Sequence, residues 1–124
     1  MPPTALIVDD DTGFRRAARR LLAARGFEVV AEAADAGQAL AAVRAHHPDC
    51  VLLDLHLPDT DGLTAALALA LAASPAPAPR ILVISTEPPD FAPSDLAALG
   101  IVALVAKDHL ATADLPALFG FSAA

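Results

Sequence analysis

Five short apolar runs alternate along the chain with segments whose apolar residues recur at helical spacing. An apolar run of this length, bounded by turn residues, is typical of a strand that is buried on both faces of a sheet. The clearest run is Cys50-Val51-Leu52-Leu53, which leads directly into Asp54. The other runs predict strands at residues 5–8, 27–33, 81–84 and 101–106.

The segments between these runs predict helices. Thr12 is expected to cap the first helix and Gly26 to end it. Further helices are predicted at residues 39–47, 63–73, 94–99 and 110–119, with a loop at Pro88 and Pro89 and with Pro116 limiting where the last helix can begin. A strand-helix unit repeated in this way builds a parallel sheet with helices on both faces, so the sequence predicts a doubly wound α/β fold.

Four of the predicted strands end in side chains that carry chemistry. The first strand ends in Asp9 and Asp10, the third in Asp54, the fourth in Ser85 and the fifth in Lys107. In open parallel sheets, ligands bind outside the carboxyl ends of the strands. Chance would produce one or two such endings, but four at the same edge of a sheet predict a common site.

The charges of this site indicate phosphoryl transfer. Three carboxylates and one ammonium sum to about −2 at neutral pH, and carboxylates that lie close together either raise their pKa values or recruit a cation. Oxygen ligands suit Mg²⁺, or Mn²⁺ in its place. A carboxylate is a competent nucleophile toward phosphoryl groups, while a hydroxyl and a lysine can hold the remaining phosphoryl oxygens. The sequence therefore predicts Mg²⁺-assisted transfer of a phosphoryl group onto an aspartate.

The composition predicts a single domain over residues 1–124 and argues against several other classes of protein. Much of the 56% hydrophobic content is alanine, and no stretch reaches about 18 uninterrupted apolar residues, so we expect no membrane contact and a cytosolic location. The single Cys50 cannot form an internal disulfide. The net charge of −7 opposes direct nucleic-acid binding, and the absence of Tyr and Trp leaves little to stack on bases.

The motifs at the strand ends resemble the receiver domain of bacterial two-component response regulators. They are Val8-Asp9-Asp10, Val51-Leu52-Leu53-Asp54 with the following Leu57-Pro58-x-x-Asp61-Gly62 turn, Val83-Ile84-Ser85, and Lys107. The resemblance covers about residues 4–119. It implies a five-stranded flavodoxin-like (βα)5 fold in three α/β/α layers, with strand order 2-1-3-4-5.

The resemblance also implies a role for each site residue. Asp54 would accept a phosphoryl group from a sensor histidine kinase or a phosphotransfer protein, so the chain would be a signalling domain and not an enzyme. Asp10, Asp54 and the backbone carbonyl of His56 would bind Mg²⁺ directly, and Asp9 would act through water. Ser85 would donate a hydrogen bond to the phosphoryl group, and Lys107 would pair with it. An output domain or a second copy of the chain is a candidate further partner.

Three features bear on how such a domain would pass on its signal. Leu104 stands where receivers usually carry Tyr, Phe or His, which swings inward on phosphorylation, so conventional aromatic switching is in doubt. The short last helix contains Pro116, which weakens the surface that receivers commonly use to dimerise. The pair Lys107-Asp108, where many receivers carry Lys-Pro, is similar to the subgroup that precedes helix-turn-helix output domains.

Two other functions stay open from the sequence. A small haloacid-dehalogenase-type phosphatase would use Asp9 as its nucleophile in an Asp-x-Asp-x-Thr pattern, but Gly13 stands where Thr is wanted. A receiver-like interaction module that is never phosphorylated would be consistent with Leu104.

The polar residues around the predicted site are expected to have mainly structural roles. Asp11 favours a helix start through the helix dipole, and Asp59 and Asp61 are typical of a turn. The His56 side chain, two residues after the acceptor, could influence how fast an acyl phosphate meets water. A solvated face, or a docking patch for a partner, is predicted where five arginines lie close in sequence: Arg15, Arg16, Arg19, Arg20 and Arg25.

Overall fold

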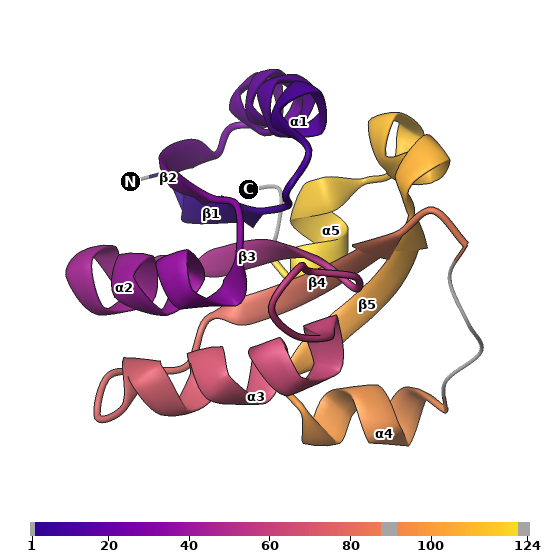
Figure 1. Ribbon diagram of the computed structural model, residues 1–124. Helices are drawn as coiled ribbons and strands as arrows, with labels where there is room; N and C mark the ends of the chain where they lie inside the picture. The colour runs from indigo at the N-terminus through magenta and orange to yellow at the C-terminus, as the bar shows by residue number, and fades with distance from the viewer. Residues whose placement is uncertain (1, 88–91, 122–124) are drawn as a thin grey trace.

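The computed structural model of the chain describes residues 2–87 and 92–121, so the loop predicted at Pro88 and Pro89 lies outside the described residues (Figure 1). The strands are β1 (Thr4–Val8), β2 (Glu28–Ala33), β3 (Cys50–Asp54), β4 (Arg80–Ser85) and β5 (Ile101–Ala106). The helices are α1 (Thr12–Ala24), α2 (Ala36–His46), α3 (Gly62–Ala73), α4 (Pro93–Ala98), the 3₁₀ helix η1 (Lys107–Thr112) and α5 (Leu115–Phe119).

The five strands form one sheet in the order β2-β1-β3-β4-β5, and every strand pair is parallel. Helices α2, α3 and α4 cover one face of the sheet, and α1 and α5 cover the other (Figure 1). This arrangement confirms the predicted doubly wound α/β fold with strand order 2-1-3-4-5 in three layers. Right-handed strand-helix-strand units build such a sheet, because each helix returns the chain so that the next strand runs parallel to the previous one.

Alternate residues of each strand pack into two separate hydrophobic cores. On β1, Leu6 and Val8 face the helices α2 and α3, whereas Ala5 and Ile7 face α1 and α5. The central strand β3 is buried along its whole length, which confirms the prediction from its continuous apolar run. Burial raises the pKa of the Cys50 thiol to about 12, so this residue is a neutral part of the core.

The N-cap of the first helix lies one residue earlier in the chain than predicted. Asp11, and not Thr12, is the N-cap of α1, because its side chain accepts a hydrogen bond from the Phe14 N–H at 3.2 Å. Thr12 is already the first helical residue. Both residue types cap helices well, so local sequence does not distinguish them. The end of the helix agrees with the prediction, since Gly26 has a φ of +89°.

The C-terminal segment differs from the predicted single helix over residues 110–119. Lys107–Thr112 forms the 3₁₀ helix η1, and α5 then begins at Leu115 with Asp114 as its N-cap. Pro116 lies in the first turn of α5, where the missing N–H has no cost. Arg25 holds the connection between η1 and α5, because its guanidinium donates hydrogen bonds to the carbonyls of Ala111 and Ala113, both at 2.7 Å. The last helix is therefore short, as expected, but begins later.

Within the described residues, no helix has both the length and the apolar character needed to cross a membrane.

Gly62, the first residue of α3, is packed against the end of β3. A Cβ at this position would lie 2.7 Å from Leu55 Cα and 2.8 Å from the Asp54 carbonyl oxygen. Both atoms belong to the backbone, so neither can move without displacing the acid at the strand end. Only glycine fits this approach.

We predict that Gly62→Ala lowers the free energy of unfolding by about 1–3 kcal/mol, the usual cost of forcing an atom into a packed site. Urea denaturation followed by circular dichroism measures this change. Gly37→Ala is the control, because the nearest atom to its added Cβ would be 3.5 Å away, an ordinary contact. Equal stability of the two variants would contradict the proposed packing constraint.

Candidate phosphoacceptor and metal site

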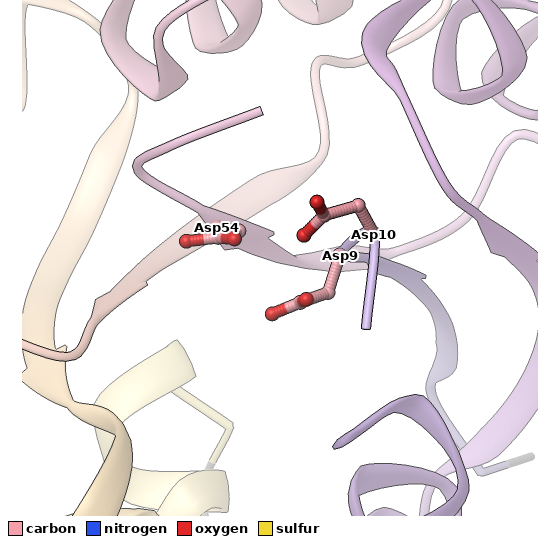
Figure 2. Close-up of side chains that lie close together, drawn as sticks. All are labelled: Asp9, Asp10 and Asp54. Carbon is pink, nitrogen blue, oxygen red and sulfur yellow. The ribbon is translucent and has the colours of Figure 1, made fainter. Parts of the chain in front are cut away.

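Three carboxylates lie together at the carboxyl edge of the sheet. Asp9 and Asp10 directly follow β1, and Asp54 is the last residue of the neighbouring strand β3. The register pairs Val8 with Leu53, so the residues that follow each strand emerge side by side. One oxygen from each of the three carboxylates lies within 4.8 Å of the others (Figure 2). Oxygen atoms at this spacing could hold a hard divalent cation such as Mg²⁺.

The three acids differ in their surroundings. Asp9 is fully buried, Asp54 is 5% exposed, and Asp10 is exposed. Asp9 Oδ1 accepts a hydrogen bond from the Asp11 N–H at 2.9 Å. The site therefore has a closed side at Asp9 and an open side at Asp10, through which a cation or a phosphodonor can approach.

The ionised form of Asp54 is unfavourable in its surroundings. Burial raises the pKa of the Asp54 carboxyl above its usual value, and the nearby charges of Asp9 and Asp10 add to this increase. A hydrogen bond from the His56 N–H to Asp54 Oδ1 at 3.2 Å opposes the pKa increase without cancelling it. A cation bound among these carboxylates would relieve the repulsion.

Lys107 provides the positive charge next to these acids. Its Nζ lies 2.6 Å from Asp9 Oδ2 and 3.7 Å from Asp54 Oδ2. Burial alone would lower the pKa of Lys107, but the hydrogen bond to Asp9 and the charges of Asp54 and Asp9 raise it overall. The ammonium also lies 4.5 Å from the centre of the Phe14 ring, a cation–π contact. Lys107 is therefore charged and positioned between two of the acids.

Ser85 ends the adjacent strand β4 and is fully buried. Its Oγ has no hydrogen-bond partner among the described residues. Burying an unpaired hydroxyl costs free energy, so a native site with such a group usually offers it to a ligand. The register pairs Asp54 with Ile84, the residue before Ser85, so Ser85 lies at the end of the strand next to Asp54.

The loop after β3 brings His56 to the site through its backbone. The His56 side chain is exposed, and its backbone pairs with Asp61 in an isolated antiparallel bridge. The geometry places His56 beside Asp54, but the roles of its carbonyl and of its imidazole stay predictions.

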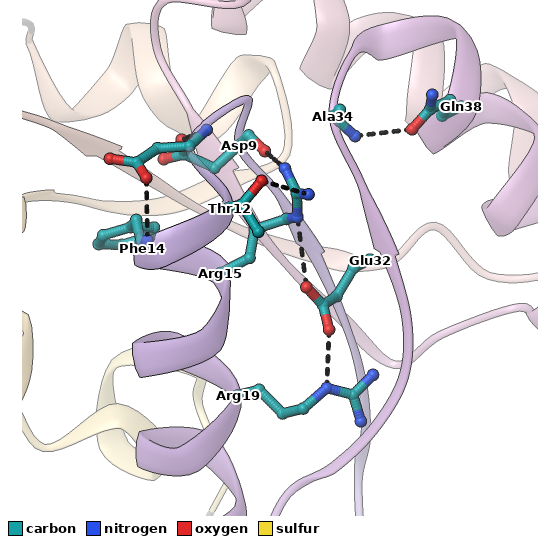
Figure 3. A network of polar contacts seen from close by, with 9 residues as sticks. Asp9, Thr12, Phe14, Arg15, Arg19, Glu32, Ala34 and Gln38 are labelled. Carbon is teal, nitrogen blue, oxygen red and sulfur yellow. Dashed lines mark hydrogen bonds and ion pairs between the residues drawn. The ribbon is translucent and has the colours of Figure 1, made fainter.

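The arginine cluster is divided between structural and free members. Arg15 donates hydrogen bonds to the Asp9 carbonyl and to Glu32, and Arg19 pairs with the other oxygen of Glu32 at 2.8 Å (Figure 3). Arg15 thus ties helix α1 and strand β2 to the backbone of the buried acid. The prediction of a solvated face is wrong for Arg15. The exposed Arg16 and Arg20 have no ion pair or hydrogen bond within the described part of the chain.

Asp59 has a contact that sequence reasoning missed. Its carboxylate accepts hydrogen bonds from the Ala36 and Gly37 N–H groups, at 3.0 and 3.1 Å. The sequence pattern around Asp59 indicates only a turn, because its partners lie more than twenty positions earlier in the chain. Asp61, predicted as a second turn residue, is the N-cap of α3 and accepts from the Thr64 N–H at 2.8 Å.

Leu104 lies on β5, three residues before Lys107, and pairs in register with Val83. It is partly buried and packs against the hydrophobic core shared with α2 and α3. An aliphatic side chain in this position cannot make the ring movement expected of an aromatic switch residue.

Comparisons with known proteins agree with this geometry. The family described as the response regulator receiver domain matches residues 5–118. Protein-glutamate methylesterase/protein-glutamine glutaminase 2 of Anaeromyxobacter dehalogenans is 42% identical over 115 residues, which cover 92% of this chain and 32% of that protein. Bacillus subtilis chemotaxis protein CheY is 45% identical over 60 residues, which cover 48% of this chain and 50% of that protein.

Solved structures of receivers share the fold. The receiver domain of NarL from Mycobacterium tuberculosis is 28% identical with a TM-score of 0.75, and the match covers 96% of this chain and 98% of that one. A response regulator from Burkholderia pseudomallei, with a phosphorylated aspartic acid and a calcium ion, is 27% identical with a TM-score of 0.78, and the match covers 94% of this chain and 66% of that one. The chain belongs to the receiver domain family of the response regulators of two-component systems.

Proposed function

We propose that the chain accepts a phosphoryl group on Asp54 in a Mg²⁺-dependent reaction and relays the signal by a change of conformation. The main support is one arrangement: three carboxylates with oxygens within 4.8 Å of one another and a lysine ammonium 2.6 Å from one of them. The neighbouring strand ends in a buried serine hydroxyl that has no hydrogen-bond partner among the described residues. The donor would be a sensor histidine kinase or a phosphotransfer protein, since receiver domains act with such partners. Residues 1–124 would form one such domain, and its cytosolic location stays a prediction.

The reaction follows from the chemistry of these groups. A carboxylate oxygen of Asp54 attacks the phosphorus of a phosphohistidine, the phosphorus–nitrogen bond breaks, and the departing imidazole nitrogen takes up a proton. Asp10, Asp54 and the His56 carbonyl would hold Mg²⁺, with Asp9 acting through water, and Mn²⁺ would also fit the oxygen ligands. The bound ion would offset the negative charge that gathers between acceptor and phosphoryl group.

Ser85 and Lys107 would receive the phosphoryl oxygens. Among the described residues the Ser85 hydroxyl has no hydrogen-bond partner and could donate to a phosphoryl oxygen, and the Lys107 ammonium is already 3.7 Å from an Asp54 oxygen. Phosphorylation would draw Lys107 from Asp9 toward the new charge. Such a movement would shift an equilibrium between two surfaces of the domain, without turnover of a substrate.

The alternative of a phosphatase with Asp9 as nucleophile receives less support. Asp9 is fully buried, one of its oxygens accepts the Asp11 N–H, and the other contacts the Lys107 ammonium. A carboxylate occupied in this way is poorly available for attack. The B. pseudomallei regulator, which carries its phosphoryl group on an aspartic acid, supports the receiver reaction by similarity.

Acetyl phosphate with Mg²⁺ should add one phosphoryl group to the protein, detected by mass spectrometry and located on Asp54 by peptide mapping. Removal of the metal with EDTA should abolish the addition, and Asp54→Asn should prevent it. Labelling of Asp9 in place of Asp54 would favour the phosphatase. Absence of labelling under any condition would favour an interaction module that is never phosphorylated.

The charge of Asp54 should destabilise the fold at neutral pH. Its raised pKa in the folded state means that the folded protein binds the proton more tightly than the unfolded chain, so stability falls as the pH rises above the ordinary value of 3.8. Asp54→Asn should therefore increase the free energy of unfolding at pH 7 by roughly 1 kcal/mol, with the gain shrinking toward pH 4.

Asp61→Ala is the matched control for this stability measurement. The hydrogen bonds from Thr64 lower the pKa of Asp61, and the Asp61→Ala substitution removes the N-cap of α3. It should lower stability at pH 7 by about 1 kcal/mol, the opposite sign. A destabilised Asp54→Asn protein would show that burial and the neighbouring acids do not make the charge of Asp54 unfavourable in the folded protein.

The free arginines of α1 are the candidate docking surface for the phosphodonor. Arg16→Glu combined with Arg20→Glu should slow phosphotransfer from a histidine kinase that phosphorylates the wild type, by about tenfold at low salt, because charges at an interface act mainly on association. The rate with acetyl phosphate should not change. Arg44→Glu, an exposed reversal on the opposite face of the sheet, is the control. An unchanged kinase reaction in the double variant would exclude this surface.

A further inference from the structure

The loop between β3 and α3 forms a small closed projection beside the site. At its base, the Gly62 N–H donates to the Leu55 carbonyl at 2.6 Å, and His56 bridges to Asp61. Nearer its tip, the Leu57 N–H donates to the Thr60 carbonyl at 3.2 Å. These contacts close the loop on itself, so a rotation about its base would move the His56 backbone relative to Asp54.

A second attachment fixes the tip of this loop. Asp59 Oδ1 accepts the Ala36 N–H and Oδ2 accepts the Gly37 N–H, the first two amides of helix α2. The helix has its own N-cap, Asp35, which accepts the Gln38 N–H at 2.7 Å. The two carboxylates thus divide the free N–H groups at the start of α2, where the helix dipole favours negative charge. In Figure 1, the loop that follows β3 lies beside this end of α2.

The contact of Asp59 joins the β3–α3 loop to the first turn of α2, in addition to the packing of α2 against α3 in their common core. Asp35 satisfies the helix end locally, so a second carboxylate is not needed to form α2. Asp59 instead attaches the tip of the β3–α3 loop to α2, whereas the contacts of Gly62 and His56 close the base of the loop. The hydrogen bonds lower the pKa of Asp59, which keeps the carboxylate charged and able to accept both bonds throughout the neutral range.

We propose that Asp59 is a positioning residue that fixes the β3–α3 loop against α2 and thereby holds the His56 carbonyl in place for Mg²⁺. This inference rests on the proposed function. By thermodynamic reciprocity, a cation bound at the site strengthens the contact of the loop with the first turn of α2. The site is thus coupled to α2 by a connection that does not involve residue 104.

The test is a Mg²⁺ titration of ¹⁵N-labelled protein followed by NMR at about 0.15 M salt, where charges more than about 8 Å apart are largely screened. Asp59→Ala should weaken Mg²⁺ binding by roughly three- to tenfold, as expected for the loss of two exposed hydrogen bonds to a charged group. Asp59→Asn loses the same charge but keeps one acceptor oxygen, so it should recover part of the affinity. The difference between these variants separates positioning from charge.

Amide exchange supplies a second readout. In the wild type, Mg²⁺ should slow hydrogen exchange at Ala36 and Gly37, and in Asp59→Ala it should not. Asp35→Ala is the matched control, because it removes a carboxylate from the same helix end but leaves the loop attached, and it should keep Mg²⁺ affinity within about twofold of the wild type. Circular dichroism verifies that each variant is folded. If Asp59→Ala does not fold, the Mg²⁺ affinity of Asp59→Asn is compared with that of the wild type instead.

The outcomes separate the inference from the proposed function. If the wild type binds no Mg²⁺, both are wrong. If the wild type binds Mg²⁺ and Asp59→Ala binds it equally well, the positioning role alone is wrong. Equal losses in Asp35→Ala and Asp59→Ala would also overturn it, because they would show a general loosening of α2.

Discussion

The ion pair between Lys107 and Asp9 is the interaction that permits three carboxylates to share one edge of the sheet. Asp9 is fully buried, and an unpaired charge there would be strongly unfavourable. Lys107 comes from the far end of the chain, directly after β5, so the site is complete only when the whole sheet has formed.

The burial of apolar residues in the two cores offsets the unfavourable polar groups of the site. Each strand packs alternate residues into two cores, and β3 is buried throughout. At its end, Asp54 keeps a raised pKa, and Ser85 at the end of the neighbouring strand has a hydroxyl with no partner in the described part of the chain. Unfavourable charge and unpaired polar atoms of this kind persist at functional sites because the surrounding packing holds them. Ligand binding would relieve both.

The elements that usually carry a receiver's signal are altered here. Leu104 is a packed aliphatic residue, and α5 comprises only Leu115–Phe119 after a 3₁₀ segment. Other connections leave the site and reach different surfaces. Arg15 links the backbone of Asp9 to α1 and, through Glu32, to β2 (Figure 3). Asp59 links the loop after β3 to α2. Hydrogen bonds therefore connect the site to elements on both faces of the sheet.

The apolar runs and the residues that end them predicted the doubly wound fold and the gathering of Asp9, Asp10, Asp54 and Lys107 at one edge of the sheet, whereas the strand order came from the resemblance to receiver domains. Apolar runs that end in charged residues predict buried parallel strands, and the ends of parallel strands meet at one edge. Tertiary structure decided what depends on distant partners. Arg15 is structural because Glu32 lies beside it, and Asp59 binds the first amides of α2 because the loop after β3 lies beside that helix. The cap at Asp11 and the late start of α5 were also decided by competition between similar local choices, which periodicity does not resolve.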